Sequence, residues 1–247
     1  MIDIPANYLW TLLLHNMILA SVCYGTGVWV QRLNIRVNYT RKINHFALMV
    51  IPFGLATVLP YRADVFTITA TLVVFVMTTA IFCRPIRDRV PMVATAFASI
   101  DRPEDRPHTL LWIVSQAIVS YAVLVAVLFL LRGDPKWMAV PLIVTGLGDG
   151  LAEPVGVRFG RHRYRVPSLA AGRRYTRSLE GSACVAAVSI AVVLVLGGDL
   201  SWGRWAVMLF AVAVCMTIAE AVSPHAWDAP LMYAVGGGVV WAVLHLP

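Results

Sequence analysis

Long apolar runs separated by short polar breaks are the main pattern along this chain. A helix of about 20 apolar residues crosses a hydrocarbon core of about 30 Å, so runs of this length predict membrane-spanning helices. The breaks combine Pro or Gly with polar residues, a combination that favours turns. The predicted spans are residues 8–30, 43–60, 65–82, 109–131, 137–156, 179–196, 202–221 and 229–246.

The segment between the third and fourth runs is too polar to cross a membrane. Within residues 83–108, Val93, Phe97 and Ile100 recur at helical spacing after Pro91, with arginines on both sides. We expect a short helix in the cytoplasmic interface, although an ordinary connecting helix or a substrate lid fits the same pattern. The predicted fold is therefore an all-α, polytopic membrane helix bundle with about eight transmembrane helices, within a range of about seven to nine.

Composition strengthens the membrane assignment. Of 247 residues, 59% are hydrophobic and 13% are charged, whereas a soluble domain carries about 25% charged residues. We expect one transmembrane domain over residues 1–247, in the plasma or inner membrane if the source is bacterial. The acidic opening 1–5 lacks the basic segment of a secretory signal, so we expect the first run to be a mature span. The four cysteines form no CxxC pair, which favours small buried residues over a metal or redox site.

Basic residues predict the orientation of the bundle. With the N-terminus outside, the inward loops 31–42, 83–108 and 157–178 hold sixteen of the 20 Lys and Arg residues. Such an asymmetry places these loops in the cytoplasm, because positive charge is retained on that side of a membrane. The net charge of +7 is explained by topology, so a nucleic-acid partner is not expected.

Acidic residues gather at the same predicted membrane level as the basic loops. They are Asp149, Glu153, Glu180, Glu220 and Asp228. Acids in membrane helices are costly and often functional, although Glu180 and Asp228 could each serve as a helix cap. Asp149 and Glu153, four residues apart, share a helical face, where like charges repel unless a cation neutralises them. Oxygen ligands of this kind suit Mg²⁺.

Glycines and arginines accompany these acids. Small residues every four positions, from Gly148 through Gly156 to Gly160, favour close helix packing, and glycine at a helix end can also expose amides to a phosphate. The loop 157–178 holds seven arginines, more than orientation requires. Because guanidinium groups match phosphate oxygens, a polyphosphate partner is the sharper interpretation.

Three sequence motifs contain these glycines and acids, with some of the arginines. They are GDGLAEPVGVRFG at 148–160, RSLEGS at 177–182, and AEAVSP from 219 followed by Asp228. They resemble the motifs of the dolichol and phytol kinases, the polyprenol kinase family, in the same order. The entry to the second span, Arg41–Lys42 with His45, is similar too. The three motifs lie in the motif-bearing region, residues 137–230. The sequence differs from the family motifs at two positions: Arg177 replaces the family's lysine, and Ala229 replaces an asparagine.

The resemblance implies a kinase that transfers the γ-phosphate of CTP, or of another nucleoside triphosphate, to an isoprenoid lipid alcohol at the cytoplasmic face. Magnesium would be held by Asp149, Glu153 and Glu180. The proton of the lipid hydroxyl would pass to Asp228, Glu220 or His45. The expected nucleotide-binding residues are Arg41, Lys42, Gly148, Gly150, Gly156, Arg174, Arg177, Ser178 and Gly181. Membrane lipids are expected partners, and a homodimer is compatible with the interpretation.

Two other functions stay open. A CTP-dependent lipid cytidylyltransferase has a similar acid–glycine helix, and Gly160–Arg161–His162 is similar to a segment of that family, but its C-terminal pattern of paired aspartates is missing. A transporter or scaffold without chemistry would place acids in mid-membrane and not at one surface.

A salt bridge between Arg177 and Glu180 is a structural alternative to a phosphate contact of Arg177.

The orientation can be tested by cysteine labelling. In a cysteine-free background, a membrane-impermeant reagent added from outside should label Gly133→Cys and leave His162→Cys unlabelled, because only the first lies in a predicted external loop. Permeabilised membranes serve as the control, in which both positions should react. Labelling of position 162 alone in intact cells would show that the predicted orientation is wrong and that the bundle is inserted the other way round.

Overall fold

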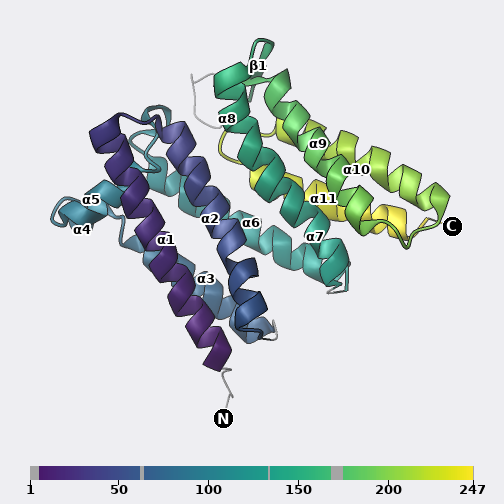
Figure 1. Ribbon diagram of the computed structural model, residues 1–247, viewed down its shortest axis with the longest axis horizontal. Coiled ribbons are helices and arrows are strands. Elements are labelled where there is room, and N and C mark those ends of the chain that lie inside the picture. Colours follow the sequence, from purple (N-terminus) through teal and green to yellow (C-terminus); the bar gives the residue numbers. More distant parts are fainter. Residues whose placement is uncertain (1–5, 62–63, 133, 168–174, 247) are drawn as a thin grey trace. The chain divides into compact units, whose positions relative to one another are not determined.

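The chain forms two compact units of helices, residues 1–114 and 115–247, each of which is described here by itself. Helix α6, Thr109–Leu130, runs across the boundary between them. The computed structural model describes residues 6–61, 64–132, 134–167 and 175–246 (Figure 1).

The first unit is built from long apolar helices and short polar connections. Helix α3 begins at a capping box, in which Asp64 accepts from the Thr67 backbone N–H and the Thr67 hydroxyl accepts from Asp64 N–H. This exchange satisfies two backbone donors that a helix start leaves unpaired. The elements are α1 Ala6–Leu33, α2 Val37–Val58, α3 Val65–Ala80, α4 Arg84–Arg87, α5 Pro91–Ala98 and a 3₁₀ turn η1 Pro103–Asp105.

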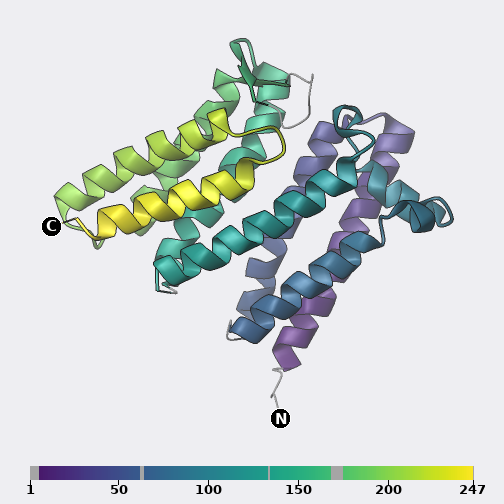
Figure 2. The ribbon, with the colours of Figure 1, turned by 180° about the vertical axis from the view of Figure 1, so that it is seen from behind.

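The second unit packs its helices lengthwise, with α10 between α9 and α11 (Figure 2). Buried valines and methionines make its core, among them Val185, Met208 and Met216. Besides the second part of α6, its elements are α7 Pro135–Ile143, a π-helical turn η2 Val144–Asp149, α8 Gly150–Phe159, β1 Arg163–Val166, β2 Tyr175–Ser178, α9 Leu179–Leu196, α10 Trp202–Val222 and α11 Asp228–Leu244.

Each of the eight predicted spans coincides with helix in the structure, so the all-α prediction is confirmed. Helix α2 carries Arg41 and Lys42 and does not qualify as a span, and α3 and α11 are apolar but shorter. Among the described residues, five helices are long and apolar enough to cross a membrane, which gives the chain the make-up of an integral membrane protein. They are Ala6–Leu33, Thr109–Leu130, Lys136–Phe159, Leu179–Leu196 and Trp202–Val222.

The fifth predicted span contains an irregular turn that periodicity does not reveal. Between α7 and α8 the chain adopts a π turn over Val144–Asp149, three residues after Pro141. Pro lacks a backbone donor and disturbs the regular ladder of a helix, and single π turns often mark functional positions. The π turn buries Gly148 and the carboxylate-bearing residue Asp149 inside the unit.

Two further predictions concern the connections. A helix does form after Pro91, as α5 over Pro91–Ala98. The segment 157–178, expected to be a loop, holds instead an antiparallel hairpin in which β1 pairs with β2, Tyr164 facing Arg177 across the strands. Arginine-rich strands have no apolar alternation, which is the usual signal for a strand, so the hairpin was not predicted.

Close packing in the first unit depends on one glycine. A Cβ on Gly27 of α1 would overlap the carbonyl oxygen of Thr95 in α5. Nearby, the buried Thr40 hydroxyl donates to the Ser99 carbonyl at 2.7 Å, and the Asn44 amide donates to the Ser99 hydroxyl at 2.8 Å. These contacts hold α1, α2 and α5 together at one end of the unit.

The role of Gly27 can be tested with a neighbour as control. Gly27→Ala should lower the free energy of unfolding by about 1–3 kcal/mol, because the added methyl group forces backbone apart in a packed interface. Gly25→Ala, on the same helix, meets nothing within 4 Å and should leave stability unchanged or slightly raised. Thermal unfolding in detergent measures both, and equal shifts would contradict the packing role.

Candidate functional site

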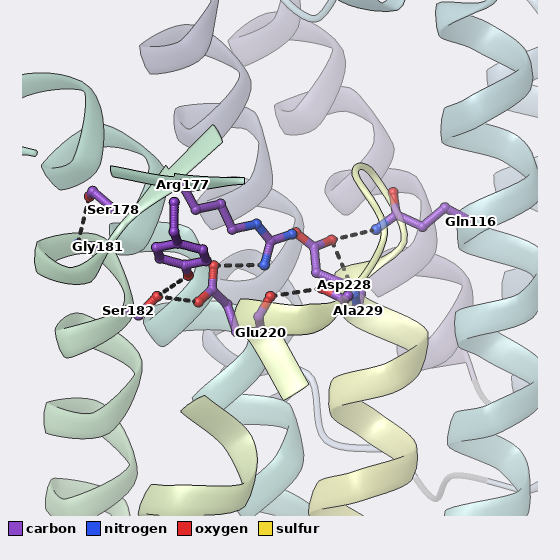
Figure 3. Close-up of polar contacts among 10 residues, drawn as sticks. Gln116, Arg177, Ser178, Gly181, Ser182, Glu220, Asp228 and Ala229 are labelled. Carbon is purple, nitrogen blue, oxygen red and sulfur yellow. Dashed lines mark hydrogen bonds and ion pairs between the residues drawn. The ribbon is translucent and has the colours of Figure 1, made fainter. Parts of the chain in front are cut away.

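A buried ion pair in the second unit joins three elements that are far apart in sequence. Arg177 Nη1 donates to Glu220 Oε1 at 2.8 Å, and Nη2 lies 3.4 Å from Asp228 Oδ2 (Figure 3). The side chains are 14%, 4% and 15% exposed respectively. The structure thus collects one predicted phosphate ligand and two predicted acids at one place.

Each partner is positioned by the end of an element. Arg177 lies on β2, Glu220 in the last turn of α10, and Asp228 at the first residue of α11. Backbone groups beside the two acids are also hydrogen-bonded: Asp228 Oδ1 accepts from the Ala229 N–H at 3.1 Å, and the backbone carbonyl of Glu220 accepts from Ser223 Oγ at 2.9 Å. The cluster is therefore built into the framework of the unit.

Two hydroxyl groups continue the network behind Glu220. Ser182 Oγ donates to Glu220 Oε2 at 2.7 Å, and the Tyr164 hydroxyl lies 2.6 Å from Ser182 Oγ. Because the Ser182 proton is committed to the carboxylate, Tyr164 is the donor in the second bond. Burial raises the pKa of Tyr164 above its ordinary value; the Ser182 bond and Arg177 act against this shift, while Glu220 adds to it.

The opposite side of the network ends at an amide. Gln116 Nε2, on α6 within the second unit, donates to Asp228 Oδ1 at 3.3 Å (Figure 3). Asp228 thus turns one oxygen to Gln116 and the other to Arg177. Ser182 ends the 177–182 motif, although no role was predicted for it. Gln116 and Tyr164 were not predicted, because an isolated polar residue in a helix or loop has no spacing signal.

Asp149 acts on the same guanidinium group. Burial by itself would lower the pKa of Arg177, but the negative charges of Asp228, Glu220 and Asp149 outweigh it, and the pKa is raised above its ordinary value. Arg177 therefore stays a cation at any working pH. Three carboxylates, those of Asp149, Glu220 and Asp228, thus act on this one guanidinium group.

Glu180 has partners of its own, which differ from those of Arg177. The Glu180 carboxylate lies 2.8 Å from the His162 ring Nδ1 and accepts from the His162 backbone N–H at 3.2 Å. The alternative of a salt bridge between Arg177 and Glu180 is wrong, because each of the two side chains binds other partners. Among the described residues, no group of three or more His, Cys, Asp and Glu side chains is arranged to hold a metal ion. The magnesium site of Asp149, Glu153 and Glu180 is not preformed, and the ion stays a prediction.

The predicted phosphate-binding glycines face protein. A Cβ on Gly148 would lie 3.2 Å from the Val185 backbone, and one on Gly156 would lie 2.9 Å from the Ser178 hydroxyl. Ser178 itself caps α9, with its hydroxyl accepting from the Gly181 N–H at 3.1 Å. In this structure these small residues pack α8 and η2 against α9, the helix-packing interpretation of the motif. Gly150 is buried at the start of α8.

The loop before Asp228 has a left-handed residue. Ala226 has φ of 65°, a conformation that costs a non-glycine residue about 1–2 kcal/mol. The adjacent His225 stacks on Tyr175 of β2, with ring centroids 3.5 Å apart, and its N–H donates to the Pro167 carbonyl at 3.1 Å. The hairpin thus holds this loop in the conformation that leads into Asp228.

Three of the remaining predicted residues belong to the first unit. Arg41, Lys42 and His45 are on α2 in the first unit, where the Lys42 residue is only 4% exposed. Their part in binding nucleotide or lipid stays a prediction. Arg174 lies outside the described residues.

The hydrogen bond from Ser182 to Glu220 can be tested by substituting two serines of α9. Ser182→Ala should lower the free energy of unfolding by about 1–3 kcal/mol, because it removes a donor from a buried carboxylate. Ser189 is also fully buried on α9, and its hydroxyl has no hydrogen-bond partner in the described part of the chain. Ser189→Ala should therefore leave the thermal unfolding temperature in detergent unchanged or raised. Comparable losses in the two variants would contradict the link.

Comparison with known proteins gives no relative to set beside this geometry. No family model, no curated protein and no solved structure matches the chain.

Proposed function

We propose that the second unit carries the phosphoryl-transfer site of a lipid-alcohol kinase. It would move the γ-phosphate of CTP, or of another nucleoside triphosphate, to an isoprenoid alcohol at the cytoplasmic membrane surface. The observation that carries the proposal is the convergence of Arg177, Glu220 and Asp228, with Asp149 acting on the same cation. All four residues belong to the sequence motifs that carry the resemblance.

The two contacts of Arg177 suit two different roles. The 2.8 Å bond to Glu220, which is 4% exposed, anchors the guanidinium group. The contact with Asp228 is longer, at 3.4 Å, and Asp228 is the more exposed carboxylate. A phosphate oxygen can replace Asp228 on Nη2, because guanidinium binds carboxylate and phosphate with the same fork. Arg177 would then hold the phosphate while Glu220 keeps it oriented.

Release from Arg177 prepares Asp228 as the proton acceptor. Gln116 binds Asp228 Oδ1, and Oδ2 is the oxygen that would face the lipid hydroxyl. The hydroxyl oxygen attacks the γ-phosphorus, the bond from this phosphorus to the β–γ bridging oxygen breaks, and the hydroxyl proton passes to Asp228. A nucleoside diphosphate and a lipid monophosphate result, with positioning and charge as the main contributions of the protein.

The surrounding helices provide a place for the lipid chain. Helices α9 and α10 expose large apolar side chains, including Leu194, Phe210 and Ile218. Apolar side chains on a spanning helix face acyl chains, so an isoprenoid tail can lie in the membrane while its hydroxyl reaches the polar end. The proposal therefore needs only the head group of the substrate to enter the cluster.

Product analysis tests the proposal against its rivals. Purified protein with labelled CTP or ATP, magnesium, and phytol, geranylgeraniol, farnesol or long polyprenols should give a lipid monophosphate and CDP or ADP. Pyrophosphate as product would mean cytidylyl transfer instead. If no alcohol in the panel yields a phosphorylated product with either nucleotide, the kinase proposal is wrong and a non-catalytic function is favoured.

A matched pair of aspartates tests the site itself. Asp228→Asn should lower kcat and kcat/KM by about 10²–10⁴-fold, because it removes the proton acceptor while keeping the shape of the side chain. Asp199, an exposed partner of Lys136 beyond the other end of α9, provides the control. Asp199→Asn should leave the rates unchanged. Normal turnover by the Asp228 variant would exclude it as the base.

A further inference from the structure

The hairpin presents two faces of different chemistry. Because strand residues alternate in direction, the cross-strand pair Tyr164 and Arg177 lies on one face and the pair Arg165 and Thr176 on the other. The first face is engaged with the helices, since Tyr164 binds Ser182 and Arg177 binds Glu220. On the second face Arg163, Arg165 and Thr176 are exposed, while Ser178 at its end is buried. We call this exposed side, with Arg163, Arg165 and Thr176, the outer face.

The outer face concentrates positive charge. Arg163 and Arg165 are exposed, as are Arg158 and Arg161 just before the hairpin. No carboxylate pairs with Arg163 or Arg165 in the ranges that the structure describes, and the nearby Glu180 is already bonded to His162. Like charges held this close repel one another unless an anion binds between or above them.

The position of the hairpin limits what this anion can be. It directly connects two of the candidate membrane spans, Lys136–Phe159 and Leu179–Leu196, so its base lies where both helices leave the membrane. Phe159 and Leu179, at this base, are 59% and 60% exposed. Large apolar residues followed by arginines match the boundary between acyl chains and phosphate groups.

We propose that the outer face of the hairpin binds the phosphate groups of anionic phospholipids. Guanidinium forks on Arg163 and Arg165 match these phosphates, and the contacts of Tyr164 and Arg177 hold the strands in place beneath them. A free nucleotide offers the same phosphate chemistry, but the location at two span ends favours lipid. The proposal does not depend on the kinase activity, because the engaged residues belong to the opposite face.

Lipid titration in detergent tests the outer face. Dioleoylphosphatidylglycerol and dioleoylphosphatidylcholine are added to the purified protein, and bound lipid is measured by native mass spectrometry. The anionic lipid should bind more tightly. Arg163→Gln with Arg165→Gln should weaken its binding about 25-fold, at about fivefold per residue near an anionic surface. Arg163→Lys with Arg165→Lys keeps the charge and should retain most of the affinity.

A control pair removes the same charge from another basic loop. Arg32 and Arg36 are exposed in the first unit, and Arg32→Gln with Arg36→Gln should leave phosphatidylglycerol binding nearly unchanged. An equal loss in this pair, or full affinity in the hairpin glutamine pair, would overturn the proposal. Displacement of the bound lipid by CTP would also overturn it, because the outer face would then be a nucleotide surface.

Discussion

The buried pairing of Arg177 with Glu220 and Asp228 is the constraint on which the second unit depends. Removing charged groups from water is costly unless they are paired and hydrogen-bonded. Each of these three groups comes from a different element, so the hairpin, the end of α10 and the start of α11 must meet for any of them to be satisfied. Ser182, Tyr164 and Gln116 then supply further hydrogen-bond donors.

Small residues make this meeting sterically feasible. Gly148 lies against the Val185 backbone, Gly156 lies against Ser178, and a Cβ on Gly181 would lie 2.6 Å from the Ala152 carbonyl oxygen. Helix α8 and the π turn therefore approach the start of α9 more closely than larger residues would allow. This approach carries Asp149 to the region of Arg177, so the glycines act on the site through helix packing.

The arginines of one short segment divide into two groups because strands alternate. Arg177 turns inward to the carboxylates, while Arg163 and Arg165 turn outward. A single hairpin therefore contributes one arginine to a buried ion-pair cluster and two arginines to an exposed surface. The stacked pair of Tyr175 and His225 adds a link from the same hairpin to the loop before Asp228.

Hydropathy alone determined where the helices lie, because the need to satisfy the backbone inside a membrane makes a long apolar run helical whatever its neighbours are. Four residues of the sequence motifs, Asp149, Arg177, Glu220 and Asp228, interact in the structure. Only the tertiary structure decided that Glu180 turns to His162, that a π turn buries Asp149, and that segment 157–178 contains a hairpin. These features depend on which charged side chain finds which partner across the fold, and local spacing carries no record of contacts between residues so far apart in the chain.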